Sequence, residues 1–188
     1  YGGGAGGAIP YLLSAGFRAT LVDQSKDAIS HVNKIYNEET KFLGAFHIYE
    51  HELVKTSADA VLMIEVMEHM YDSQLEVALD NVKGFLRQSG KLLITVPNDE
   101  DLTLNQTYCP NCNHVWHGMQ HVRKWDTKSL REYLEKNGFV LESVTETHIL
   151  PNIKLFLSKK YFMGAMLLLL KKLTFQNPPH LIAVATKK

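Results

Sequence analysis

Short apolar runs alternate with amphipathic segments along the chain. The apolar runs predict strands, at 19–22, 45–49, 60–64, 91–96, 140–147 and 180–186. The segments with apolar residues three or four positions apart predict helices, at 9–15, 27–36, 75–86, 125–137 and 155–173. This alternation is typical of an α/β protein with a parallel sheet that helices cover.

The order of these elements predicts one open, twisted, mostly parallel sheet with helices on both faces. Strands that are joined through helices nearly always cross over with a right hand, which stacks them into one sheet. The length of 188 residues and the lack of repeats or low-complexity segments predict a single domain, 1–188. Ligands of such sheets bind beyond the carboxyl ends of the strands. Asp23 and the residues that follow Ile64 and Val96 are therefore expected on one edge.

Composition and charge exclude several classes of protein. Lys plus Arg equal Asp plus Glu at 20 each, so no net charge attracts a polyanion, and no nucleic-acid partner is expected. No run reaches the roughly 18–20 apolar residues that a transmembrane helix needs. The most apolar stretch, 162–170, is expected to be a core helix rather than a helix on a membrane surface. A cytoplasmic location is expected, and the oligomeric state is left open.

The chain opens on a glycine-rich turn that fits two nucleotide-binding patterns. Gly2, Gly4 and Gly7 have the GxGxxG spacing of dinucleotide-binding proteins, whereas Gly2, Gly4 and Gly6 have the GxGxG spacing of methyltransferases. In both, glycine lets the backbone approach the ligand, and an acidic residue about 20 positions later accepts hydrogen bonds from ribose hydroxyls. Asp23 holds that position. The turn alone does not choose between the two cofactors.

Three later segments make the choice. They read SADAVLMIEVMEHM at 57–70, GKLLITVPN at 90–98, and HVRKWD at 121–126 followed by SL and NGF. In this order they resemble the fourth strand, the fifth strand and the following segment of class I S-adenosylmethionine-dependent methyltransferases. The resemblance covers nearly the whole chain and implies a Rossmann-like class I methyltransferase fold. It also implies that the family's first strand is missing, so that the sequence begins inside the cofactor loop.

The resemblance implies a set of cofactor contacts. Asp23 would hold the ribose diol, Gln24 would lie against the adenine, and Glu50 or His51 would stand where the family usually has Asp. Backbone groups of Glu65, Val66 and Met67 would line the methionyl side. The full set of implied cofactor-binding residues is Gly2, Gly4, Gly6, Asp23, Gln24, Glu50, His51, Glu65, Val66 and Met67.

Methyl transfer to a hydroxyl or an amine also needs a group that removes a proton. Histidine suits this role because its ordinary pKa lies near neutral pH. His121 is the first candidate for the catalytic base and His69 the second. The alternative for each is an ordinary hydrogen-bonding or exposed loop histidine. For Glu68, a structural role and a role in the pocket both stay open.

The polar loop 98–124 predicts a metal site. Cys109 and Cys112 have the CxxC spacing of a zinc knuckle, and His117 and His121 would complete a tetrahedral set of four ligands, with His114 also nearby. The alternative is a reduced cysteine pair without metal. A thioredoxin-like role is disfavoured, since no strand–motif–helix context surrounds the pair. If His121 binds zinc, it is not a free base.

The predicted function is therefore methyl transfer from S-adenosylmethionine to a small-molecule acceptor through an oxygen, nitrogen or carbon nucleophile. Two alternatives stay open: an NAD(P)-dependent oxidoreductase on a Rossmann sheet, and a silent methyltransferase-like binding module with a zinc-bound loop. The loop 98–124 and a variable helical insertion, 151–179, are expected to form the acceptor pocket. Such segments vary between relatives, so the acceptor itself is not predicted.

Overall fold

The computed structural model describes residues 1–50, 58–148 and 178–188, and its helices and strands alternate as the sequence predicts. The helices are α1 (Ile9–Ser14), α2 (Lys26–Ile35), the short 3₁₀ helix η2 (Met67–His69), α3 (Asp72–Phe85) and α4 (Thr127–Lys136). The strands are β1 (Ala19–Asp23), β2 (Phe42–His47), β3 (Ala58–Ile64), β4 (Leu86–Pro97), β5 (Gln106–Tyr108), β6 (Val115–His117), β7 (Phe139–Thr147) and β8 (His180–Lys187).

The strands form two sheets and a separate hairpin. β1 and β2 pair in parallel, and a four-stranded sheet has the order β3-β4-β8-β7. In that sheet β3 and β4 are parallel, while β8 runs antiparallel to both of its neighbours. The predicted Rossmann-like α/β fold is confirmed, and the four-stranded sheet is mixed. Because inward and outward side chains alternate alike in either direction, the apolar pattern of β8 does not encode its direction.

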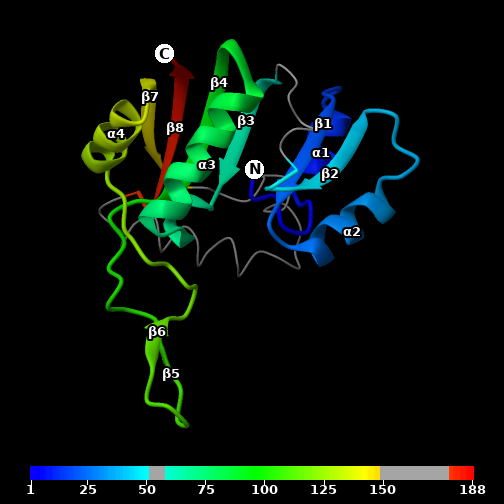
Figure 1. Cartoon of the computed structure of the whole chain (residues 1–188). Coiled ribbons are helices and arrows are strands. Elements are labelled where there is room, and N and C mark those ends of the chain that lie inside the picture. The colour runs from blue at the N-terminus through cyan, green and yellow to red at the C-terminus, as the bar shows by residue number, and fades with distance from the viewer. Residues whose placement is uncertain (51–57, 149–177) are drawn as a thin grey trace, which may run out of the picture.

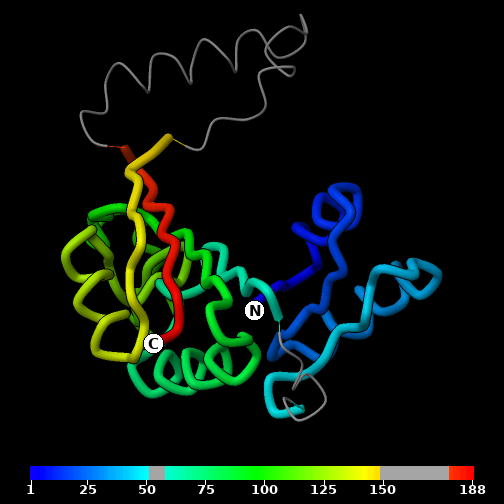
Figure 2. The backbone as a smooth tube through the Cα atoms, turned by 90° about the horizontal axis from the view of Figure 1, so that it is seen from above, coloured from blue at the N-terminus to red at the C-terminus, as the bar shows by residue number. Residues whose placement is uncertain are grey.

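The first residues of the chain lie between the two sheets and bond to both. The amino group of Tyr1 donates to the Leu62 carbonyl of β3 at 2.9 Å. The amide of Gly2 donates to the Val22 carbonyl of β1 at 2.8 Å. Figures 1 and 2 both place the N-terminus between β3 and the β1–β2 pair. The carboxyl ends of β1 and β3 therefore meet at the opening glycine loop.

Two apolar clusters hold the elements together. The larger packs α3 and α4 against the four-stranded sheet, with Leu79, Ile94 and Leu134 fully buried. The smaller lies among α1, α2 and the β1–β2 pair around Val32, which is also fully buried. Burial of a leucine side chain contributes about 1.5–3 kcal/mol, so the larger cluster contributes more hydrophobic stabilisation than the smaller one. None of the helices in the described ranges is long and apolar enough to cross a membrane.

Some predicted boundaries differ from the structure. The second strand covers Phe42–His47 instead of 45–49, and the fourth begins at Leu86 rather than at residue 91. The loop predicted at 98–124 contains the hairpin of β5 and β6, which projects from the body of the protein (Figure 1). The predicted helix at 155–173 and nearly all of the predicted insertion lie outside the described residues. The single domain stays a prediction.

Candidate active site

The opening loop uses its glycines in two different ways. Gly2, Gly4 and Gly6 have φ angles of 68°, 49° and 80°, in the region that side chains disfavour, whereas Gly7 is not among the positive-φ residues. A Cβ on Gly2 would lie 2.8 Å from the Val66 side chain, and one on Gly6 would lie 3.0 Å from Val32. A Cβ on Gly4 would meet nothing within 4 Å. Gly2 and Gly6 thus permit close packing, and Gly4 presents bare backbone to open space.

Asp23 ends β1 and closes this loop. One oxygen of its carboxylate accepts the Gly4 amide at 2.8 Å, and the other accepts the Ser25 amide at 2.8 Å. The side chain lies at the edge of the sheet, and the residue is only 8% exposed. Ser25 in turn caps α2 through the Ala28 amide. The predicted pairing of the glycine turn with Asp23 is therefore present in the structure.

Gln24 and Glu50 both interact with His47 at the end of β2. The His47 ring donates from Nε2 to the Gln24 carbonyl at 3.0 Å. The His47 amide donates to the Glu50 carboxylate at 2.9 Å. Both residues therefore lie near the carboxyl ends of β1 and β2, where Asp23 pairs with His47. His51 lies outside the described residues.

The side chains of the residues that leave β3 are engaged in contacts within the protein. Glu65 has a φ of 52°, unusual for a residue with a side chain, and its carboxylate accepts the Thr95 hydroxyl at 2.7 Å. Its other oxygen lies 3.7 Å from His180. Val66 packs against Gly2, and Met67 is fully buried in the core. Any contact of Val66 or Met67 with a ligand would therefore be made by backbone atoms.

The long loop returns to η2 and brings two predicted histidines together. The Val122 amide donates to the Glu68 carbonyl at 2.9 Å, and the Arg123 guanidinium donates to the Met70 carbonyl at 2.8 Å. The rings of His69 and His121 consequently lie edge to face, with centroids 4.8 Å apart. Both catalytic candidates thus occupy one cluster beside the exit of β3.

Glu100 organises this cluster, and sequence reasoning missed it. Its carboxylate accepts His121 Nδ1 at 2.5 Å, and its second oxygen lies 3.7 Å from His117 Nε2. The His121 side chain is only 8% exposed. His69 donates from its own Nδ1 to the Gln120 carbonyl at 3.3 Å. In the sequence, Glu100 stands between two other acidic residues and resembles an ordinary solvated surface.

Glu68 is the most deeply buried member of the cluster. It is 1% exposed, and within the described ranges neither oxygen of its carboxylate has a hydrogen-bond partner. Burial raises the pKa of Glu68 to about 7, and the nearby carboxylates of Glu65 and Glu100 add to the rise. Burial also lowers the pKa of His69.

The cysteines lie apart from this cluster, in the turn between β5 and β6. The backbone amides of Cys112 and Asn111 donate to the Cys109 sulfur and lower the pKa of that thiol. Among the described residues, no group of three metal-ligating side chains contains a cysteine, whereas His117 and His121 group with Glu100. The predicted ligand set Cys109, Cys112, His117 and His121 is therefore not assembled here.

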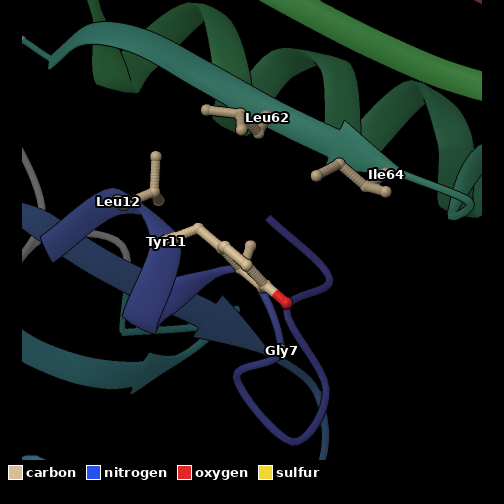
Figure 3. Close-up of a pocket in the computed structure, with 6 residues that line it drawn as sticks. Gly7, Tyr11, Leu12, Leu62 and Ile64 are labelled. Atoms are coloured by element: carbon tan, nitrogen blue, oxygen red, sulfur yellow. The ribbon is translucent and has the colours of Figure 1, made fainter. Parts of the chain in front are cut away.

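An apolar groove lies on the other side of the glycine loop. It has a volume of about 390 Å³ and runs between α1 and β3. Figure 3 shows Leu62 and Ile64 of β3 facing Tyr11 and Leu12 of α1 across it. The Tyr11 hydroxyl is the polar side-chain group that lines the groove. The groove therefore suits a nucleoside less well than the polar rim at Asp23 does.

A glycine loop that is closed by a strand-end carboxylate, at the carboxyl edge of a Rossmann-like sheet, defines a nucleotide-cofactor-binding protein. The comparison with protein families makes this specific. The model of the methyltransferase domain family matches residues 1–144, so the chain belongs to that family.

Solved structures show the same fold. A Pyrococcus horikoshii protein has 15% identity and a TM-score of 0.62, over 100% of this chain and 79% of that one. An Archaeoglobus fulgidus SAM-dependent methyltransferase has 19% identity and a TM-score of 0.58, over 99% and 83%. The Burkholderia thailandensis 1,6-didemethyltoxoflavin-N1-methyltransferase, solved with S-adenosylhomocysteine, has 16% identity and a TM-score of 0.60, over 100% and 68%. No curated protein matches the chain significantly in sequence.

Proposed function

We propose that the protein transfers a methyl group from S-adenosylmethionine to a small-molecule acceptor. The observation that carries this proposal is the junction of Gly4 and Asp23. The Gly4 amide is held by the Asp23 carboxylate, while the position of its absent Cβ faces open space. This junction lies at the carboxyl ends of β1 and β3 and fits an adenosyl group. Membership of the methyltransferase domain family supports the choice of cofactor.

Different residues of the rim would contact different parts of the cofactor. The Asp23 carboxylate keeps lone pairs beyond its two backbone hydrogen bonds, and these would accept the ribose hydroxyls. Gln24 and Glu50, with His51, would border the adenine. The backbone of Gly2, Gly4 and Gly6 and of Glu65 to Met67 would border the methionyl part.

Methyl transfer mainly requires that the acceptor is aligned with the methyl group and that water is excluded. When bound, S-adenosylmethionine supplies a methyl group on a sulfonium sulfur, which is already a good leaving group. The chain's own residues hold the acceptor in line and remove its proton. His121 is the proposed base, and its hydrogen bond to Glu100 fixes the orientation of the ring. His69, 4.8 Å away between ring centroids, is the second candidate.

The acceptor is proposed to be a small molecule with an oxygen, nitrogen or carbon nucleophile. The chain carries no net charge that would attract a nucleic acid. A neighbour of the same fold acts on 1,6-didemethyltoxoflavin, a small molecule, and this supports the same acceptor class here.

The proposal is tested by calorimetry with S-adenosylhomocysteine and with NAD. We expect the wild-type protein to bind S-adenosylhomocysteine and not NAD. Asp23→Asn should weaken binding by about 10–100-fold, because loss of a charged hydrogen-bond acceptor costs roughly 1.5–3 kcal/mol. Asp27→Asn is the matched control, since Asp27 is exposed on the next helix and should leave affinity unchanged. Binding of NAD alone, or equal affinity in both variants, would contradict the proposal.

A further inference from the structure

We propose that Glu68, His69 and His121 form a binding site for a divalent transition-metal cation. One donor atom from each of these residues lies within 4.8 Å of the others. Two imidazoles and one carboxylate are a ligand set that zinc and related cations use, with further positions left for water or a substrate. The set shares only His121 with the cysteine-based site that the sequence predicts.

The hydrogen bonds of the two histidines orient them as metal ligands. His69 donates from Nδ1 to the Gln120 carbonyl at 3.3 Å, and a carbonyl only accepts. His121 Nδ1 is likewise occupied by the Glu100 carboxylate at 2.5 Å. Each ring therefore keeps Nε2 unprotonated in its neutral form. Metal-binding histidines nearly always show this pattern, in which the second nitrogen donates to a carboxylate or carbonyl.

Glu68 supplies an independent indication of a cation-binding site. It is 1% exposed, and both of its oxygens lack a hydrogen-bond partner among the described residues. A buried carboxylate without a partner is costly, and native proteins normally pair such a group or use it to bind a metal. Its Oε1 lies 3.9 Å from His69 Nε2. Donors of a tetrahedral zinc site lie roughly 3.4 Å apart, so a small closure would complete the site.

A second grouping contains His121 together with Glu100 and His117, and these last two residues support the site from outside. The short contact between Glu100 and His121 is a hydrogen bond that a cation placed between them would break. His117 lies 3.7 Å from the other oxygen of Glu100 and helps to hold that carboxylate in place. The geometry thus separates three inner ligands from two residues that support them.

The position of the site connects it with the proposed methyl transfer. Glu68 and His69 follow Val66, whose side chain packs against Gly2 of the cofactor loop. On the basis of the proposed function, a cation here would bind the acceptor's oxygen or nitrogen and make its proton easier to lose. With the cation bound, His121 and His69 act as ligands, and the role of His121 as the base belongs to the metal-free protein.

The test is zinc binding by the full chain, without S-adenosylmethionine, so that its outcome is independent of the proposed function. The protein is stripped with a chelator and carries Cys109→Ser and Cys112→Ser, which removes the thiols. We expect one Zn²⁺ per chain by calorimetry and a Zn²⁺-dependent rise in Tm. Glu68→Gln and His69→Gln should each weaken binding by more than 100-fold, and Glu100→Gln by about 10–100-fold.

His114→Gln is the matched control, because His114 is an exposed histidine of the same loop outside the cluster, and it should bind zinc normally. Glu68→Gln should not lower the Tm of the metal-free protein, since it removes a buried charge without a partner. The proposal is overturned if the thiol-free protein binds no zinc, or if binding survives both Glu68→Gln and His69→Gln. Loss of binding only when the cysteines are replaced would assign the metal to the hairpin instead.

Discussion

At the scale of single residues, three glycines of the opening loop share a backbone conformation but differ in their surroundings. Gly2 and Gly6 are pressed against Val66 and Val32, and Gly4 faces open space. Substitution at the first two would therefore disturb packing before it disturbed a ligand. At Gly4, by contrast, an added side chain would affect binding of the cofactor directly.

Gly4→Ala should weaken binding of S-adenosylhomocysteine by tenfold or more, an energy of at least about 1.4 kcal/mol. The new methyl group would project into the space proposed for the cofactor. Its positive φ also costs an alanine about 1–2 kcal/mol of stability, so the Tm should fall slightly. Gly7→Ala is the control, because Gly7 is also open but lacks the positive φ. Calorimetry that finds equal affinity in both variants would place the ligand elsewhere.

The glycines and Asp23 could be predicted because a cofactor loop is local: its spacing and its acidic partner lie within one loop–helix–strand stretch, 2–23. Glu100 could not, since its contact with His121 depends on how the long loop folds back onto η2. The cysteines show the converse error of scale. Their CxxC spacing predicted a zinc site with the histidines, but the sequence does not reveal that the hairpin places them apart from the histidine cluster.

At the scale of elements, helix boundaries could be predicted better than strand relations. α4 begins after Asp126, whose side chain accepts the Ser129 amide at 2.6 Å, and Gly138 follows it with a φ of 82°. Both signals are local, because each depends on one residue type at the end of the helix. The strands of the hairpin escaped prediction because they are short and mostly exposed, without an alternating apolar pattern.

Asp126→Ala should lower the free energy of unfolding by about 1 kcal/mol at neutral pH, as loss of an N-cap usually does. Hydrogen bonds from the Ser129 amide and hydroxyl lower the pKa of Asp126 in the folded protein. The stabilisation is therefore present above the pKa that Asp126 has in the unfolded protein. It is lost as the pH falls through the lower pKa that Asp126 has in the folded protein. Urea unfolding at several pH values measures this, with exposed Lys128→Ala as control. A difference that persists unchanged in strong acid would argue against capping by the carboxylate.

At the scale of the whole molecule, the first residues of the cofactor loop connect the two sheets. Tyr1 bonds to β3 and Gly2 bonds to β1, so the loop lies where both carboxyl ends meet (Figure 2). The fold class could be predicted from the alternation of elements. The mixed direction of the four-stranded sheet could not, because β8 presents the same apolar faces in either direction.

A structure of the protein with S-adenosylhomocysteine tests the central claim most directly. The account predicts the ribose hydroxyls within about 2.6–3.2 Å of the Asp23 carboxylate, with the amino-acid part of the ligand beside Gly4. An adenosyl group bound in the apolar groove between α1 and β3, or anywhere that leaves Asp23 without contact to it, would contradict the account.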